Sequence, residues 1–558
     1  MKKALHTLQS LRTKYEVAAL AEKRQLLKSR LITANATAKE LFELHELLLF
    51  IRAYPDNEEI LRLAEQCQEK CNNAIQRILR KKSNSAQRIF ENSGIIGTTI
   101  TGCFSYDLVS WLHHQYPTAI CFDSFGGDVE EVYAHLLSLL PASIREHYTD
   151  HGYTTAEEWL QTSASHNRYD QLKLILSLFS SEQLHFRQRD ALFDRLQLYV
   201  EIDTTRVPCR SNNSIPRPAV YYHEQGLIRK TDLNTILQEA LPEEKNLSHE
   251  EKQQYIASIR LQLLSLYRET DPGTYADIND LHVYHVGRGM EIVLQGMQPE
   301  RRNPIDAYIG FMAFKNGRPY AYGGAWLLGK MAKIGINVFP SFRGGESAWF
   351  FAQLKRVYYQ QFNPAYFVAE PYQIGRDNPE GIETGAFWFY YRLGYRPMQN
   401  KLQQLAAEHW KKMLAQPGKK SPVKILLQLV EDEMVYLPSG NESALKQKFD
   451  TAGLSHAITS HIRKRYKGDI GRFMAHSKAC LLTSGILPAL KADKINAIEQ
   501  LSQYLFIEDD LIQFTVDERK SITALLIEKT IGSDCHYARL LSENKKMQEI
   551  LYRLYRRK

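Results

Sequence analysis

The sequence predicts an α+β protein of several domains, in which a mixed β-sheet domain lies between helix-rich regions. The chain has 558 residues, which is enough for several domains at roughly 100–200 residues each. Hydrophobic residues make up 44% of the chain and charged residues 24%, as in globular proteins, so a disordered or fibrous protein is excluded. Strand-like runs are concentrated in residues 280–400, whereas helical spacing of apolar residues dominates on both sides.

We expect five regions along the chain, because the pattern of apolar residues changes four times. They are a helical hairpin (1–85), a small α/β unit (86–150), a helical region (151–275), the mixed-sheet domain (276–400) and a helical C-terminal region (401–558).

The first region reads as two helices. Thr37 and Glu40 have the spacing of a capping box, which starts a helix. The run Tyr54-Pro55-Asp56-Asn57 ends that helix, and a second one starts near Glu58. Such a hairpin offers a surface for packing or for a protein partner.

The second and third regions combine short strands with helices. Residues 95–102 and 118–122 are rich in β-formers, and Gly126-Gly127 follows the second run. That glycine pair is either a plain turn or an anion site at a helix start. Ser248 and Glu251 form a further capping box and open a helix in the third region.

Residues 280–400 contain most of the strand signals. Asn316-Gly317 separates two of the runs, and this dipeptide is a strong signal for a two-residue hairpin. The predicted strands are Leu281–Val286, Met290–Leu294, Tyr308–Phe314, Tyr320–Trp326 and Ala332–Val338.

A glycine turn and a helix follow the last of these strands. Arg343-Gly344-Gly345 precedes apolar residues at Phe350, Leu354 and Val357, whose spacing is helical. Next come a strand at Tyr366–Ala369, a loop at 373–378, and an aromatic helix at Thr384–Leu393 that Gly394 ends.

This order of elements, together with two motifs, resembles the GNAT superfamily of N-acyltransferases. The family motif is V-x-P-x-x-R-G-x-G-x-G/A at the start of a helix. Here the run is Val338-Phe339-Pro340-Ser341-Phe342-Arg343-Gly344-Gly345-Glu346-Ser347-Ala348. The valine, the proline, the arginine, the first glycine and the final small residue match. The resemblance covers about 120 residues of the chain.

The resemblance implies an acyl-coenzyme A donor, whose pyrophosphate would bind the backbone N–H groups of the motif. Glycine allows close approach, and the helix N-terminus favours negative charge. It also implies that the strands Ala332–Val338 and Tyr366–Ala369 lie side by side and then separate. The helix should start within two residues of Gly345. The residues expected to contact the donor are Val338, Arg343, Gly344, Gly345, Glu346, Ser347 and Ala348.

The second motif, A-x-x-x-Y-x-x-x-G-F/Y, implies a catalytic tyrosine. It matches Ala386, Tyr390 and Gly394-Tyr395 here. Tyr390 would protonate the leaving thiolate, and the alternative role is core packing among aromatic neighbours. Glu370, at the end of a strand, is the candidate base for the amine acceptor, with Asp377 in reserve. The alternative for both carboxylates is an ordinary surface position.

Glu346 departs from the motif because it replaces the second glycine. A carboxylate about 4 Å from a pyrophosphate would cost a few kcal/mol near a protein surface. The side chain either points away or favours the helix start as an acid in the first turn. Otherwise the donor is not coenzyme A, and the Fem-type transferases show that this fold can use aminoacyl-tRNA. On this basis, Glu346→Gly should leave donor binding unchanged or improve it.

The remaining features bear on partners and location. Net charge is +8, from 71 Lys and Arg against 63 Asp and Glu. Basic residues cluster in Arg463-Lys464-Arg465 and Arg556-Arg557-Lys558. These clusters are expected to be solvated surface, and nucleic-acid binding is the weaker alternative. Seven cysteines, an odd and small number, argue against a secreted disulfide framework, and Cys67, Cys71 and Cys535 read as structural thiols.

No run of about 18 uncharged apolar residues occurs, so we expect no membrane association. We also expect a cytoplasmic protein, and we expect no metal cofactor. The function expected is transfer of an acyl or aminoacyl group, from a thioester or a tRNA, to an amine. The alternative is a scaffold or binding protein whose GNAT-like domain has lost catalysis.

Overall fold

The computed structural model describes the whole chain except residues 30, 34, 82–83, 151–154, 181–183, 217–218, 417, 419, 485, 487–500, 502, 506–513 and 557–558. The chain forms two compact units. Unit 1 comprises Met1–Gly226, Glu250–Thr274 and Lys315–Pro319. Unit 2 comprises Leu227–His249, Tyr275–Phe314 and Tyr320–Lys558. Arg557 and Lys558 of the last basic cluster lie outside the described residues.

Unit 1 starts with a cluster of helices rather than a simple hairpin. The capping box of Thr37 and Glu40 is present, because each residue bonds the other's backbone N–H group. Buried leucines from these helices make a common core, which also encloses the free thiols of Cys67 and Cys71. Burial raises the pKa of the Cys67 thiol to about 11. The helices are α1 (Lys2–Leu11), α2 (Val17–Lys28), α3 (Ala38–Ala53), α4 (Glu58–Arg80) and α5 (Asn84–Phe90).

A three-stranded antiparallel sheet with the order β1-β3-β2 follows. The region 151–275, expected to be helical, also contains the strand β3 (Leu198–Asp203), which inserts between β1 (Thr99–Cys103) and β2 (Ile120–Phe125). The amides of Gly126 and Gly127 donate to the carbonyls of Gln197 and Leu196, so they are occupied by the protein. The helices of this part are α6 (Tyr106–Gln115), α7 (Val129–Ser138), α8 (Ala142–Asp150), α9 (Ala156–Ala164), α10 (Arg168–Phe179), α11 (Phe186–Leu196), α13 (His249–Leu264) and α14 (Asp271–Thr274).

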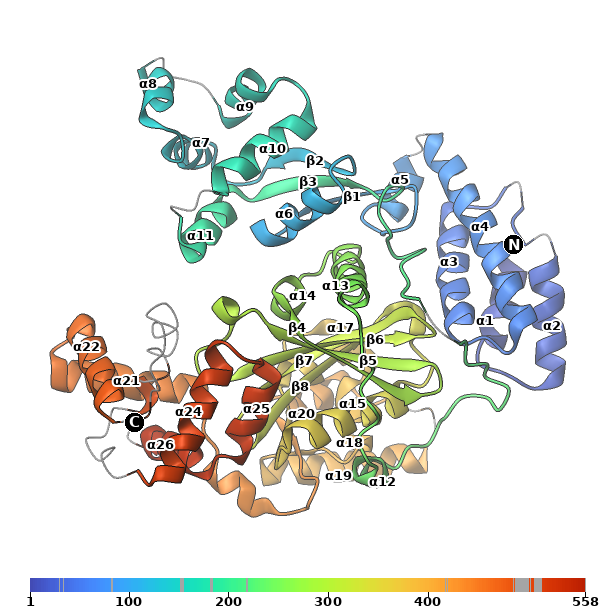
Figure 1. Ribbon diagram of the computed structural model, residues 1–558. Helices are drawn as coiled ribbons and strands as arrows, with labels where there is room; N and C mark the ends of the chain where they lie inside the picture. The colour runs from blue at the N-terminus through green and yellow to red at the C-terminus, as the bar shows by residue number, and fades with distance from the viewer. Residues whose placement is uncertain are drawn as a thin grey trace. The chain divides into compact units, whose positions relative to one another are not determined.

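Unit 2 is built on an eight-stranded mixed sheet with the order β10-β11-β9-β8-β7-β6-β5-β4 (Figure 1). Asn316 and Gly317 both have positive φ, so the predicted two-residue hairpin is confirmed. All the strands predicted in residues 280–370 are present. The strands are β4 (Ala276–Gly287), β5 (Met290–Met297), β6 (Ala307–Lys315), β7 (Arg318–Leu328), β8 (Met331–Val338), β9 (Tyr366–Ala369), β10 (Arg396–Pro397) and β11 (Met434–Tyr436).

Two details of unit 2 differ from the prediction. The strand β11 comes from the region 401–558 that we expected to be helical, and it pairs with β9 and β10. The predicted helix Thr384–Leu393 is divided by Gly385, whose φ of 70° lies in the left-handed region. It therefore forms α17 (Pro379–Thr384) and α18 (Ala386–Arg392).

The other helices of unit 2 surround this sheet. The long helix after the glycine turn buries Phe350, Leu354 and Val357, as their spacing predicted. The hydroxyl of Tyr358 donates to the carbonyl of Ile309 on β6, at 2.8 Å. The helices before β10 are α12 (Leu233–Gln238), η1 (Pro299–Arg301), η2 (Pro340–Phe342), α15 (Ser347–Phe362) and α16 (Pro371–Ile374).

The C-terminal part of unit 2 is helical apart from β11. Arg463, Lys464 and Arg465 form the exposed last turn of α21. No helix among the described residues is long and apolar enough to cross a membrane. The elements are α19 (Asn400–Ala415), α20 (Val423–Leu429), η3 (Glu442–Gln447), α21 (Thr451–Tyr466), α22 (Ile470–Thr483), α24 (Val516–Thr530), α25 (Asp534–Glu543) and α26 (Lys545–Arg556).

Candidate active site

The two strands expected to border a donor site are neighbours. Strands β8 and β9 are parallel and pair over three positions, the last being Lys333 with Val368. Beyond Lys333, β8 continues to Val338 in register with β7 only. The pairing of β8 with β9 therefore ends at Lys333, and β9 itself ends at Ala369, so a separation of the two strands before the glycine turn stays a prediction.

The glycine turn follows directly at the end of β8. Arg343 is extended and is not part of a helix, and α15 begins at Ser347, two residues after Gly345. Gly344 is exposed and has a φ of 81°, a conformation that a β-carbon disfavours. The predicted start of the helix is confirmed.

The N-terminus of α15 has no side-chain cap. Within the described part of the chain, the backbone N–H groups of Ser347, Ala348 and Trp349 donate to no protein acceptor. Ser347 and Ala348 are partly exposed. These amides and the helix dipole make the turn suited to an anion.

Glu346 is turned into the protein and does not bond these amides. It is 1% exposed, and Arg288 lies against it with Nη2 2.6 Å and Nε 2.8 Å from Oε1. The amide of Ile228 donates to the same oxygen, at 2.9 Å. The carboxylate is thus neutralised by a partly buried guanidinium, so the like-charge cost expected from the sequence does not arise. Glu346→Gly would remove this ion pair, so the expected improvement on this substitution has lost its basis.

Two arginines border the exposed side of the turn. Arg229 donates from Nη1 to the carbonyl of Gly344, at 3.0 Å. Arg343 is half-exposed and forms an ion pair with Glu380 of α17, at 2.5 Å. Sequence reasoning identified Arg343 but missed Arg229 and Arg288, since no local pattern links either residue to the turn.

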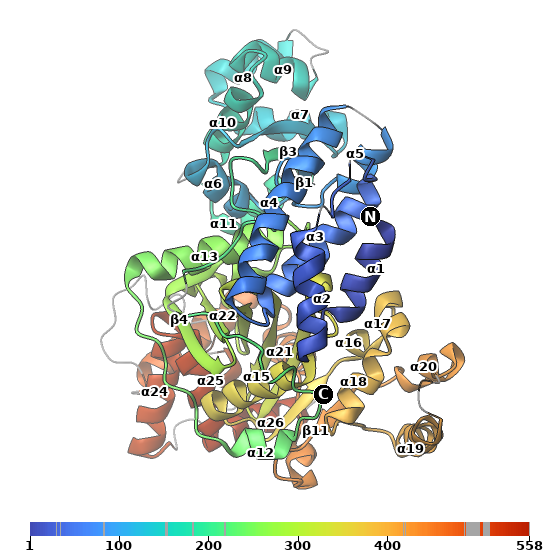
Figure 2. The same cartoon turned by 90° about the vertical axis from the view of Figure 1, so that its right-hand side faces the viewer.

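A cavity of about 1070 Å³ lies beside the turn and is lined by residues of the segments α17–α18 and α19–α20. Figure 2 labels these four helices. Its walls are mostly apolar, with the rings of Trp388 and Trp410 stacked at a centroid distance of 5.7 Å. Three cations, Arg343, Arg392 and Lys420, line it as well. The cavity therefore combines aromatic faces with positive charge next to the turn 343–348.

Tyr390 does not have the surroundings of a catalytic acid. It is 2% exposed, and its ring packs edge-on against Phe351 and Tyr395. Its hydroxyl bonds no protein atom of the described residues. Burial raises the pKa of the phenol, which opposes ionisation. The structure supports the alternative role of core packing.

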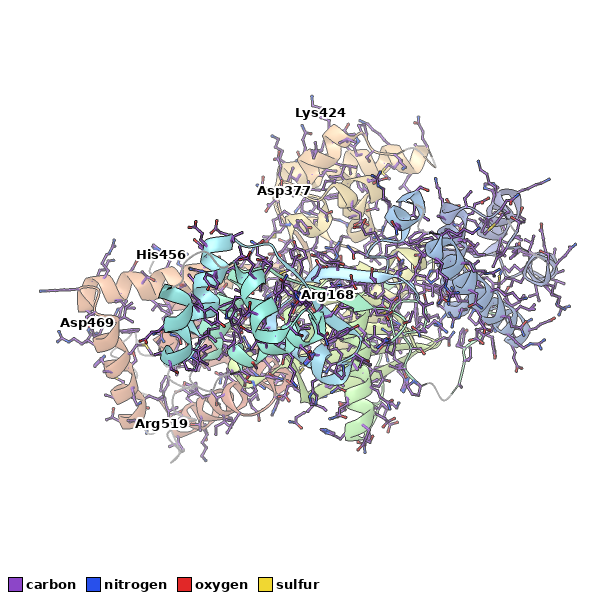
Figure 3. The ribbon with its side chains drawn as sticks, turned by 90° about the horizontal axis from the view of Figure 1, so that it is seen from above. Arg168, Asp377, Lys424, His456, Asp469 and Arg519 are labelled. Atoms are coloured by element: carbon purple, nitrogen blue, oxygen red, sulfur yellow. The ribbon has the colours of Figure 1, made fainter. Side chains whose placement is uncertain are left out.

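The two candidate bases differ in position. Glu370 directly follows β9, close to where the pairing of β9 with β8 ends. Its Oε1 is 2.7 Å from Nζ of Lys333. Both side chains are partly exposed, so solvent reaches the pair. Asp377 is 90% exposed and lies at the outer surface of its segment (Figure 3), with Arg376 as its ionic neighbour at 3.9 Å. Glu370 remains the better-placed carboxylate.

Comparison with known proteins adds no identification. No protein-family model, no curated protein and no solved structure matches this chain.

Proposed function

We propose that unit 2 binds an acyl thioester such as acyl-coenzyme A at the turn 343–348 and transfers its acyl group to an amine. The observation that carries this proposal is the uncapped N-terminus of α15, which follows the glycine turn at the end of β8, a strand whose pairing with β9 ends at Lys333. The GNAT resemblance implies this arrangement, with the thioester between the strands and the pyrophosphate on the amides. Arg229 and Arg343 add positive charge at the phosphates.

The residues that line the cavity are suited to the nucleotide end of such a donor. An adenine ring is planar and apolar on its faces, which suits the stacked Trp388 and Trp410. The phosphates of the nucleotide complement Arg343, Arg392 and Lys420. An aminoacyl-tRNA also ends in an adenine nucleotide, so both donor types proposed from the sequence share this chemistry.

In the transfer step, the amine nitrogen attacks the thioester carbonyl, the C–S bond breaks, and the thiolate leaves. Glu370 takes the proton that the amine loses, directly or through a water molecule. Its ion pair with Lys333 must open for this, and the partial exposure of both side chains permits it. Tyr390 has no part in this proposal.

Thermal unfolding of the full chain with and without coenzyme A tests donor binding. A donor at 100 times its Kd stabilises the native state by about 2.7 kcal/mol. Gly344→Val should remove this stabilisation, because the side chain strains the backbone and covers the amides. Gly440→Val is the matched control, since Gly440 has a similar φ of 68° and no neighbour within 4 Å of its added β-carbon. Equal stabilisation of both variants by coenzyme A would contradict the proposed site.

A second candidate function is a binding protein without transfer activity, and the buried hydroxyl of Tyr390 favours it. The two candidates are separated by mass spectrometry of amines and peptides incubated with acetyl-coenzyme A. Acylated product that disappears with Glu370→Gln supports transfer. Donor binding without any product across the acceptor panel supports the binding protein.

A further inference from the structure

Three side chains with metal-binding atoms meet between β4 and α25, far from the turn 343–348 in sequence. They are Asp280 and His282 on β4 and Cys535 in the first turn of α25. One ligand atom from each lies within 4.8 Å of the other two. Asp280 and Cys535 are buried, and His282 keeps one partly exposed edge.

The ring of His282 is held by a second carboxylate. Nδ1 of His282 lies 2.8 Å from Oε1 of Glu244, which leaves Nε2 facing Oδ1 of Asp280 at 3.0 Å. A carboxylate on the far nitrogen is the usual outer partner of a metal-bound histidine, because it orients the ring and fixes its tautomer.

Asp280 is oriented as well. Its Oδ2 accepts from the amides of Asp534, at 2.7 Å, and Cys535, at 3.2 Å. Its Oδ1 faces His282 and also accepts from the hydroxyl of Ser533. Both oxygens therefore accept hydrogen bonds from the start of α25, and Oδ1 also faces the imidazole of His282.

We propose that Asp280, His282 and Cys535 bind a zinc ion that fastens α25 to β4. Carboxylate, imidazole and thiolate are all ligands of Zn²⁺, and three protein ligands leave one tetrahedral position for water. Bonds of about 2.0–2.1 Å place tetrahedral ligand atoms roughly 3.3 Å apart, close to the 3.0 Å between Nε2 and Oδ1. The partly exposed edge of His282 is the side from which water reaches the ion.

Zinc binding leaves the net charge of the site unchanged. The ion replaces two protons, the one shared by Nε2 and Oδ1 and the thiol proton of Cys535, so two positive charges leave and two arrive. Glu244 keeps its bond to Nδ1–H in both states. The sequence alone indicated no such site, because 253 positions separate His282 from Cys535, and the adjacent His536 faces Glu528 instead.

The competing explanation is a hydrogen-bonded cap of α25, in which His282 bridges two carboxylates without any metal. Metal analysis separates the two. The full chain is stripped with a chelator, incubated with zinc chloride, desalted, and its zinc content measured by mass spectrometry. Cobalt is then added in place of zinc, since a Co²⁺–thiolate bond gives a charge-transfer band in the near ultraviolet.

We expect one zinc ion per chain, and a thiolate band with cobalt. Cys535→Ser and His282→Gln should each lose the ion, and the glutamine keeps an amide between Glu244 and Asp280. Cys209→Ser is the control, because Cys209 is a fully buried thiol of unit 1 and should leave zinc binding intact. Glu244→Gln should weaken zinc binding roughly 10–100-fold.

Zinc content that is no higher in the wild type than in His282→Gln would overturn the proposal, as would a cobalt complex without the thiolate band. If Cys535→Ser does not fold, His282→Gln decides the question, since its ring is partly exposed. The result is independent of the proposed acyl transfer, because Asp280, His282 and Cys535 have no role in the proposed transfer step.

Discussion

Two buried ionisable side chains, one at the N-terminus of α15 and one within it, have opposite surroundings. Glu346, at the N-terminus of the helix, is enclosed with Arg288 and an amide donor. Lys355, two turns further on, is fully buried, and its ammonium nitrogen bonds no polar atom of the described residues. Its neighbours are aromatic rings, with Nζ 3.3 Å from the ring centroid of Tyr436 and 4.3 Å from that of Tyr395.

The comparison shows that the effect of a buried charge on stability depends on its partner. Glu346 belongs to a pair that is costly to break, whereas Lys355 is costly as it stands. A desolvated cation–π contact contributes about 2 kcal/mol, and burying an ammonium costs several kcal/mol. Desolvation therefore wins at Lys355 and holds its pKa well below the usual range.

Breaking the pair should have the largest effect. Arg288→Ala removes the guanidinium from beside the buried carboxylate of Glu346, which keeps the hydrogen bond from the amide of Ile228, so we expect a loss of about 3–5 kcal/mol. Urea unfolding followed by the fluorescence of the tryptophans of unit 2 measures this loss. The double variant Arg288→Met/Glu346→Leu should recover most of it, because neither charge is then present. A double variant as unstable as the single one would show that packing, and not charge, dominates here.

The opposite change at Lys355 should stabilise the protein. Lys355→Met keeps the length of the side chain and removes the amine, so we expect a gain of about 1–4 kcal/mol at neutral pH. The gain should shrink as pH rises. In the unfolded chain Lys355 stays protonated up to its ordinary pKa of 10.5, whereas the folded state releases the proton at lower pH. Unfolding of the wild type thus takes up a proton between these two values, and its stability rises with pH across that window.

Thermal unfolding of wild type and Lys355→Met at several pH values up to about 10.5 measures this convergence. A difference that stays constant with pH would mean that the aromatic rings keep the lysine charged. Lys424→Met is the control, because Lys424 is exposed on α20 and should show neither effect (Figure 3).

The smallest effect is expected at Tyr390, close to Lys355. Tyr390→Phe removes a buried hydroxyl that bonds no protein atom of the described residues, so stability should stay level or rise by about 1 kcal/mol. Turnover should not change, whereas loss of a general acid would lower it by roughly 10²–10⁴. Kinetics of any acyl transfer found, normalised to folded protein, decide between these outcomes.

Local patterns predicted much of unit 2. Strand-like runs and the Asn316-Gly317 turn located the strands of residues 280–338, and the Arg343-Gly344-Gly345 run located the start of α15. These features depend on neighbours in sequence, so one chain is enough to read them. The strands β3 and β11 were not predicted, because each lies in a region dominated by helical patterns and pairs with strands from an earlier part of the chain.

The sequence by itself determined where the glycine turn and the uncapped start of α15 occur, because glycine conformation and helix start are local properties. Only the tertiary structure decided what surrounds each side chain. It joined Glu346 to Arg288, enclosed Tyr390 among rings, and brought Asp280 to Cys535. The physical reason is that burial and pairing depend on packing between distant segments, which determines whether a carboxylate, a phenol or a thiol meets water, a counter-charge or a hydrocarbon surface.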